Sequence, residues 1–534
     1  MSRSRTVWSR RADDYDALLK RTQHRFPTGY CIEPRLRFAG DQIGANPKRG
    51  IADNGPLEEF KIRPIIRVGV IGTRDSIDNL SSYVARISGV VQAGLNAREK
   101  PFDPIVFPDF PGTDPGAAFR VEVRLDAAHR RVIAQKLLEL DLKSASASDQ
   151  IKNVVARLSA ELAVLRDVDP PPDVVAIVMP PFVQDAIQHV GEEMRRRPAA
   201  ALSPSEAFEK LMSKVESKSK QGFFDFAFAG DEPKDDRGYW NFHHALKARA
   251  MGTAIPTQLI WERSLRGEQT SQDPASIAWN LMTGLYYKAG NIPWEVVGLP
   301  FDTCFLGISF FKTGLNADAA THTSLAQVFS GHGEGLVMKG GNAVKEPRRA
   351  AYMDRLTAER LVRDALDLYG LHHPGGQARR LVVHKTSPFT PEEIAGIESA
   401  AGEMSLDLVS ITAGSDMRFL RSGTHPPLRG TYVKLSDRET LLFTVGYVPE
   451  FRQYPGAKNP EPVLLRHDQG DSARETICEE IMALTKLNWN SCAYAAKQPI
   501  TTLFADAVGA IMGEYLAIPE PERGKLQTKY RFFM

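Results

Sequence analysis

The sequence predicts an α/β fold with two domains, and three observations support this prediction. First, the apolar, β-branched run IIRVGVIG at residues 65–72 is followed by apolar residues at helical spacing over residues 75–95, the strand-then-helix unit of an α/β layer. Second, residues 174–179 are uniformly apolar, as in a central parallel strand with both faces covered. Third, beyond Phe301 the order changes to several strands before a helix, which indicates a second sheet.

The first domain is expected to be a doubly wound sheet. Residues 119–125 alternate as a strand does, and one apolar helix face is predicted over residues 151–165 by spacings of four and three. Helices are predicted at residues 240–250 and 274–289, on either side of a strand at residues 256–261. Residues 65–300 are therefore expected to form one Rossmann-like domain. Residues 1–64, rich in Arg, Pro and Gly, are expected to be a lead-in segment with little core of its own.

The second domain is predicted to span residues 301–534. Strands are expected at residues 303–311, 324–329, 335–339, 380–385, 406–411, 431–435, 440–446 and 463–466. Helices are expected at residues 357–369, 476–487 and 501–517. Another helix has a clear start, because Thr390 is a good N-cap, Pro391 suits the first turn and Glu393 completes a capping box.

Composition and charge limit the class of protein. The chain has 534 residues, a hydrophobic fraction of 43% and a net charge of +2, so any nucleic-acid binding must come from a local group of Lys and Arg. Its four cysteines are far apart and form no CxxC pair, which favours a reduced, cytoplasmic protein. The N-terminus lacks the apolar core of a signal peptide, and no apolar run is long enough to span a bilayer.

A group of polar residues in the first domain is a candidate phosphate site. His243 and Lys247 are four apart on one predicted helix and therefore share a face. Gln258 lies on the following strand, and Lys288 lies near the end of the next helix. Cationic and amide donors that converge in this way suit the several oxygens of a terminal phosphate. The alternative is that each of these residues is an ordinary surface or satisfied polar residue.

The stretch from Ile255 to Lys312 resembles the junction between the MID and PIWI domains of Argonaute proteins. It reads IPTQLIW, then ASIAWNLMTGLYYKAGNIPW, then DTCFLGISFFK, and the resemblance extends over roughly residues 35–534. The resemblance implies that Lys247, Gln258 and Lys288 hold the 5′ phosphate of a guide strand. His243 or His244 stands where many members of the family have Tyr. The resemblance also implies that Met534 reaches this pocket and helps to hold a Mg²⁺ ion beside the phosphate.

The resemblance further implies an RNase H-like PIWI domain that lacks its catalytic acids. Ser309 and Thr386 stand where active members have their first two metal-binding aspartates, while Asp506 matches the last ligand position. Hydroxyls do not replace carboxylates in two-metal cleavage, so no catalytic residue is assigned. The segment LTKLNWNS is similar to a stretch that lies along the guide and target strands. It implies contacts from Lys486, Asn488 and Asn490 to nucleic acid.

The absence of room for N and PAZ domains makes the chain look like a short prokaryotic Argonaute. In that subfamily the partner is an effector with an APAZ region fused to a TIR, sirtuin-like or nuclease domain. By resemblance, the complex would load a guide RNA, recognise single-stranded target DNA and activate the effector in defence against phages or plasmids, with a higher oligomer as one possible active form. Two alternatives remain open: an active RNase H-type nuclease, and an unrelated α/β enzyme that uses GVIGTRDS as a nucleotide loop.

Overall fold

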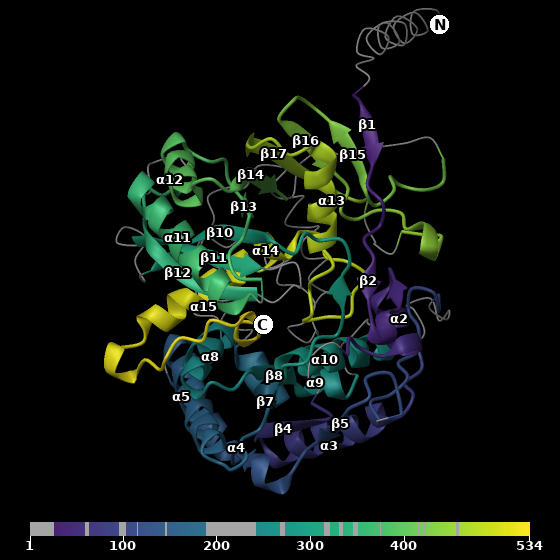
Figure 1. The fold of residues 1–534 in the computed structure, drawn as a ribbon. Coiled ribbons are helices and arrows are strands. Elements are labelled where there is room, and N and C mark those ends of the chain that lie inside the picture. Colours follow the sequence, from purple (N-terminus) through teal and green to yellow (C-terminus); the bar gives the residue numbers. More distant parts are fainter. Residues whose placement is uncertain are drawn as a thin grey trace, which may run out of the picture.

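The computed structural model describes residues 26–58, 63–94, 103–114, 116–144, 147–187, 242–267, 273–313, 321–329, 335–344, 351–373, 375–413, 417, 419, 423–454 and 459–534. Its two α/β halves lie one above the other in Figure 1, with the last residues of the chain between them. The first described strands run along one side and reach both halves (Figure 1).

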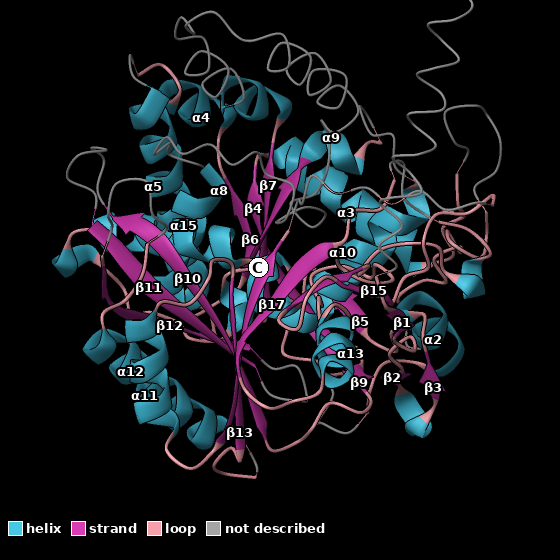
Figure 2. Ribbon diagram, turned by 90° about the horizontal axis from the view of Figure 1, so that it is seen from above, coloured by secondary structure: helices cyan, strands magenta, loops and turns pink. Residues whose placement is uncertain are grey.

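The smaller sheet belongs to the first half and is parallel. Its order is β5 (Glu122–Arg124), β4 (Ile65–Gly72), β7 (Val174–Met179) and β8 (Thr257–Trp261), with β6 (Arg130–Val132) also paired to β4. Alternate residues of β7 enter different cores. One core includes α3 (Arg74–Ser88) and α10 (Pro274–Lys288), and the other includes α5 (Ala147–Arg166) and α8 (Phe242–Ala250). The doubly wound layer is thus confirmed, since helices cover both faces of the sheet (Figure 2). A short helix, α4 (Gln135–Asp141), precedes α5.

The larger sheet contains nine strands among the described residues. Its order is β1 (Thr28–Tyr30), β15 (Thr431–Lys434), β16 (Glu439–Leu442), β17 (Val463–Gln469), β14 (Ser405–Thr412), β13 (Arg380–Lys385), β10 (Thr303–Thr313), β11 (Thr321–Phe329) and β12 (Gly335–Ala343). The pairs β10–β13 and β13–β14 are parallel, whereas β10–β11 and β11–β12 are antiparallel. The earliest strand, β1, therefore forms one edge of this sheet, whereas β10, the first strand after Phe301, lies inside it between β13 and β11.

Helices cover both faces of the larger sheet. α11 (Arg355–His372) and α12 (Pro391–Ala401) pack on one face through residues such as Leu361 and Ile397. α14 (Ile500–Leu503) and α15 (Ala505–Ala517) pack on the opposite face of β10, where they also meet the core of the first half. α13 (Arg474–Leu484) packs on β14 near the other end of the sheet. The predicted α/β fold class is therefore confirmed for both halves.

The lead-in segment connects the two halves. β2 (Leu36–Arg37), β3 (Ile43–Gly44) and β9 (Glu295–Val296) form a small sheet beside α2 (Pro47–Asn54). Its buried residues, among them Phe38 and Ile51, enter the core of the first half, while β1 adds a strand to the larger sheet. The segment therefore shares the cores of its neighbours.

Several predicted elements agree with the structure in detail. The limits predicted for β4, β7 and β13 are those observed, and the capping box of Thr390 and Glu393 is present at the start of α12. The single helix predicted at residues 501–517 is wrong, because non-helical backbone at Phe504 divides it into α14 and α15. All four cysteines are buried thiols without disulfides. Within the described residues, no helix is both long and apolar enough to cross a bilayer.

Candidate nucleic-acid 5′-phosphate site

Four separate segments bring the predicted phosphate-binding residues together. His243 and Lys247 lie one turn apart on α8, Gln258 is the second residue of β8, and Lys288 is the last residue of α10. The tail after α15 returns to this place, so the end of the described chain lies beside α8 and β8 (Figure 1). Because consecutive parallel strands and their crossover helices lie side by side, residues far apart in the sequence meet here.

Direct contacts join these side chains to one another. The Lys247 ammonium donates to the main-chain oxygen of Thr257 at 2.6 Å and to that of Met534. The Lys288 ammonium donates to Oε1 of Gln258, whose amide nitrogen donates to the oxygen of Leu259 at 2.9 Å. Lys247 and Lys288 are each 2% exposed, and Met534 is 7% exposed. The structure thus brings together two buried cations, an amide and the tail.

The two histidines differ in position. His243 is half-buried, while His244 is buried, and their ring centroids are 5.7 Å apart. Burial, and then the positive charges of Lys247 and Lys288, lower the pKa of His243 well below its ordinary value. His243 is therefore neutral at pH 7 and lies close to both lysines. As the member with most exposed surface, it marks the side from which a ligand would approach.

The main-chain oxygen of Thr257 is a part of this site that the sequence does not reveal. It accepts from Lys247 and holds that ammonium towards the tail. Any residue at position 257 provides the same oxygen, so no side-chain pattern signals it. The contact with Met534 joins residues 287 positions apart, so only the family resemblance could suggest it.

The described residues place few oxygen ligands for the predicted Mg²⁺ ion at this site. This ion prefers near-octahedral coordination by oxygen and is usually bound through carboxylates. Here Oε1 of Gln258 and one main-chain oxygen of Met534 each accept from a lysine ammonium group, and no cluster of three or more His, Cys, Asp or Glu suited to a metal occurs among the described residues. The positive charge beside a bound phosphate would thus come from the lysines.

The positions matched to catalytic acids lie in the larger sheet. β10 and β13 are parallel neighbours, and their pairing ends with Ile308 opposite Lys385. Ser309 and Thr386 are the next residue after each of these two. Ser309 is 6% exposed and its hydroxyl has no hydrogen-bond partner in the described part of the chain, whereas Thr386 is exposed. Asp506 is exposed in the first turn of α15. Two of these three positions carry no charge.

The segment expected to follow the nucleic acid is largely buried. The Lys486 ammonium pairs with Glu33 at 2.6 Å, donates to the oxygen of Ala45 at 3.0 Å and lies 3.4 Å from the centroid of the Tyr494 ring. Asn490 is buried, while Asn488 is half-buried and accepts from the Asn490 amide. Of the three residues, only Asn488 has exposed surface that could contact a nucleic-acid strand, and Lys486 stabilises the junction with the lead-in segment.

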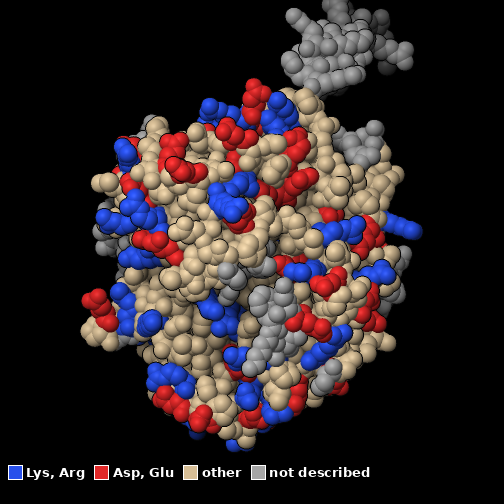
Figure 3. Space-filling view, in the orientation of Figure 1, with Lys and Arg blue, Asp and Glu red and all other residues tan. Residues whose placement is uncertain are grey.

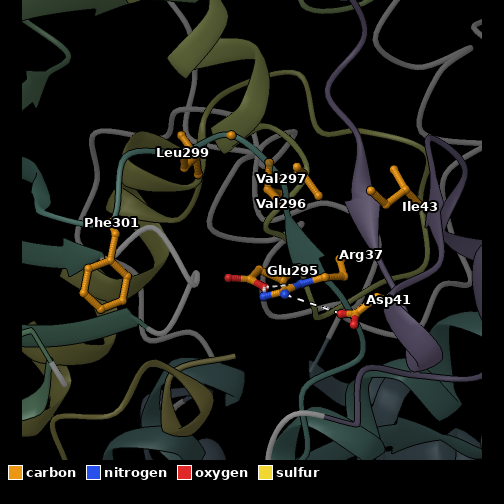
Figure 4. A pocket seen from close by; sticks show the side chains of 9 residues that line it. Arg37, Asp41, Ile43, Glu295, Val296, Val297, Leu299 and Phe301 are labelled. Atoms are coloured by element: carbon orange, nitrogen blue, oxygen red, sulfur yellow. Dashed lines mark hydrogen bonds and ion pairs between the residues drawn. The ribbon is translucent and has the colours of Figure 1, made fainter.

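A surface hollow lies elsewhere. It has a volume of about 500 Å³ and is lined by residues of the lead-in segment and by residues 295–301 (Figure 4). Arg37 crosses it to Glu295 at 2.9 Å and lies 3.6 Å from Asp41, so its charges are largely compensated within the protein. None of the residues of the candidate phosphate site lines it.

The loop GVIGTRDS does not form a phosphate cradle. Thr73 caps α3, and its hydroxyl lies 2.8 Å from that of Ser76, which in turn donates to Glu262 at 2.5 Å. A Cβ built on Gly72 would lie 2.7 Å from the oxygen of Val178, so this glycine allows close packing of β4 on β7. The Glu262 carboxylate accepts from the side chains of Ser76 and Asn79 near the start of α3, so a negative charge already lies beside the place where a nucleotide phosphate would bind.

Comparisons with known proteins agree with the fold. No model of a protein family matches the chain. The Argonaute protein of Aquifex aeolicus (strain VF5) is 25% identical over 319 residues, which cover 58% of this chain and 42% of that protein. The structure of Clostridium butyricum Argonaute bound to a guide DNA and a 19-mer target DNA matches with a TM-score of 0.59 and 15% identity, over 95% of this chain and 55% of that one. Drosophila Piwi matches with a TM-score of 0.54 and 13% identity, over 94% of this chain and 56% of that one.

The fold is therefore that of the MID and PIWI domains of Argonaute and Piwi proteins, with an RNase H-like second half. The chain is a homologue of the Aquifex aeolicus Argonaute and spans about half the length of the relatives it matches.

Proposed function

We propose that this protein holds the 5′-phosphorylated end of a short guide RNA and uses the guide to recognise complementary single-stranded DNA. The observation that supports it best is the convergence of Lys247, Gln258, Lys288 and Met534, with His243 beside them. Two buried ammonium groups suit a phosphate dianion, because charge-assisted hydrogen bonds are strongest where water is excluded. Clostridium butyricum Argonaute, with the same fold, has been solved with a guide DNA and a target DNA.

The surface charge fits a local binding site better than a general attraction to nucleic acid. Figure 3 shows Lys and Arg intermixed with Asp and Glu over one face of the protein. The net charge of the whole chain is only +2. Affinity would therefore depend on a few well-placed cations, and base pairing with the guide would provide the sequence specificity.

We also propose that the PIWI half does not cleave the target. Ser309 and Thr386 follow the last paired residues of adjacent parallel strands, and neither carries a carboxylate. Two-metal cleavage needs several grouped acids, whereas the third matched position, Asp506, supplies one. Absence of cleavage of a guide-matched DNA in Mg²⁺ or Mn²⁺ is the expected result, and a cut opposite the guide would contradict it.

The biological role we propose is that of a short prokaryotic Argonaute in the cytoplasm. Its partner would be an APAZ-containing effector with a TIR, sirtuin-like or nuclease domain, activated when the guide finds phage or plasmid DNA. Co-expression with the product of the neighbouring gene tests this role, with NAD consumption and nucleic-acid degradation as readouts. A complex that forms but does not respond to guide and target together would contradict it.

The phosphate site is tested by comparing two RNAs that differ only at the 5′ end. We expect a 5′-phosphorylated RNA to bind at least tenfold more tightly than its 5′-hydroxyl twin, about 1.4 kcal/mol or more. Lys247→Ala with Lys288→Ala should remove this difference. Lys136→Ala with Lys143→Ala is the matched control, since it removes two exposed lysines at α4 of the same half. Equal binding of both RNAs by the unaltered protein would refute the site.

A further inference from the structure

Two of the four buried cysteines meet where the lead-in segment joins the second half. Cys31 directly follows β1 and Cys478 lies in α13, yet both belong to the same apolar core, and a hydrogen bond joins their side chains. Cys31 is 1% exposed and Cys478 is 0% exposed. The other two cysteines, Cys304 and Cys492, lie in two different cores. The fold thus places one pair of thiols side by side, although they come from opposite ends of the sequence.

Main-chain packing fixes Cys31 at this position. Its amide donates to the oxygen of Gly430 at 2.9 Å, and a Cβ built on Gly430 would lie 2.4 Å from the oxygen of Cys31, so a glycine is needed there. A Cβ built on Gly29 of β1 would lie 2.2 Å from the Tyr432 ring, which therefore lies against this strand. The Tyr432 hydroxyl donates to Glu475 of α13 at 2.7 Å. These contacts hold β1 beside α13 independently of the two cysteines.

We propose that Cys31 and Cys478 are a redox modification site, and that a small disulfide oxidises them to a disulfide bond that fastens the lead-in segment to α13. The reaction is a thiol–disulfide exchange in two steps. One cysteine thiolate attacks the small disulfide, forms a mixed disulfide and releases one reduced thiol. The other cysteine then attacks the mixed disulfide and releases the second reduced thiol. The protein loses two electrons and two protons, and the small disulfide gains both.

Burial limits when this reaction occurs. The hydrogen bond with Cys31, and then burial, raise the pKa of the Cys478 thiol, so little reactive thiolate is present in the closed structure. β1 has three residues and pairs only with β15 in the described part of the chain, so opening of this edge breaks few main-chain hydrogen bonds. Opening exposes Cys31 to the oxidant, and closing returns it to Cys478. The pair therefore stays reduced in a reducing compartment and is joined when small disulfides accumulate.

The bond would also fix a carboxylate that neutralises two buried cations. Glu33, two residues after Cys31, pairs with Arg429 at 2.9 Å and with Lys486 at 2.6 Å. Arg429 is 2% exposed and Lys486 is 3% exposed, so each depends on this counter-charge. When the lead-in segment lifts, both cations lose it. Oxidation would therefore make exposure of these two cations rarer.

The first measurement maps the bond in the full, unaltered chain. The protein is incubated with glutathione disulfide, the remaining thiols are blocked with N-ethylmaleimide in denaturant, and unreduced peptides are identified by mass spectrometry. We expect a cross-link between the peptides that carry Cys31 and Cys478, with Cys304 and Cys492 alkylated, and its loss in dithiothreitol. Glutathione attached to either cysteine without a cross-link, a cross-link to another cysteine, or alkylation of all four thiols would overturn the inference.

The second measurement is hydrogen exchange of peptides that cover residues 26–38. Oxidation should slow this exchange about tenfold or more, because the bond restrains opening of the segment. Cys31→Ser and Cys478→Ser should each abolish the effect of the oxidant. Cys492→Ala, which leaves the pair intact, is the control and should respond like the unaltered protein. A cross-linked protein whose exchange is unchanged would also overturn the inference, and this comparison needs no variant to fold.

Discussion

Lowering the pH from 7 to 5 should weaken the larger sheet through one buried histidine. His384 lies on the central strand β13, is 1% exposed, and its Nδ1 is 2.8 Å from the hydroxyl of Thr501. Burial, and then the charge of Arg380, lower the pKa of His384 to about 3, while Asp407 partly offsets the shift. An unfolded histidine titrates near pH 6.5.

The sign and size of the change in stability follow from the native and unfolded pKa values of His384. Because the native pKa is below the unfolded one, the native state stays neutral while the unfolded state takes up a proton as the pH falls. Stability is therefore complete above about pH 6.5 and is lost as the pH falls below it. Each pH unit below about 6.5 costs about 1.4 kcal/mol, so the change from pH 7 to pH 5, of which about 1.5 units lie below 6.5, costs about 2 kcal/mol. Any native pKa well below 5 gives the same loss, so the prediction does not depend on its exact value.

The assay is hydrogen exchange of peptides that cover β13, which reports the free energy of the opening that exposes this strand. After correction for the intrinsic effect of pH, protection should fall about 30-fold in the unaltered protein between pH 7 and pH 5. His384→Gln removes the titrating imidazole, so this variant should lose much less protection between pH 7 and pH 5. His372→Gln, on the exposed end of α11, is the control and should behave like the unaltered protein. Equal losses of protection in all three proteins would contradict the prediction.

Three further predictions concern the other charged positions. EDTA should change the affinity for a 5′-phosphorylated RNA less than twofold in a binding titration, because lysines and not a metal supply the positive charge; a large loss would show that a cation is needed. Glu33→Gln should destabilise the protein by about 3 kcal/mol in thermal unfolding, since it leaves Lys486 buried without its counter-charge; an unchanged melting temperature would contradict this. Ser309→Asp with Thr386→Asp should not yield cleavage of a guide-matched DNA in Mn²⁺, because the two new carboxylates and Asp506 would be the only acids at the matched positions; a specific cut would show that these acids, or others beside them, complete the site.

The parts of the fold that the sequence predicts well are those with a strong local signal. β4, β7 and β13 are apolar runs of strand length, and α12 begins with a complete capping box. The small strands of the lead-in segment have no such signal. β1 is three residues long and is fixed by pairing with β15, about 400 positions later, so its register is a property of the assembled sheet.

The same distinction applies to the site. The spacing of His243 and Lys247 predicts a shared helix face from local geometry alone, whereas their approach to Lys288 needs the packing of α8, β8 and α10. Lys486 shows the opposite case. In a polar stretch a lysine is expected to be exposed, but Glu33 from the lead-in segment and the ring of Tyr494 make its burial favourable. Long-range partners decide such positions.

The location of the lysine pair suggests how binding would affect the whole protein. Lys247 belongs to the first half, and the oxygen it contacts on Met534 belongs to the tail of the second half. α15, which precedes this tail, packs on β10 through Gly509 and Phe311. A phosphate bound here would therefore contact α8, β8 and α10 together with a segment anchored to β10 of the larger sheet. Because a ligand stabilises the arrangement that it contacts, the guide binding proposed above should tighten the junction between the two halves.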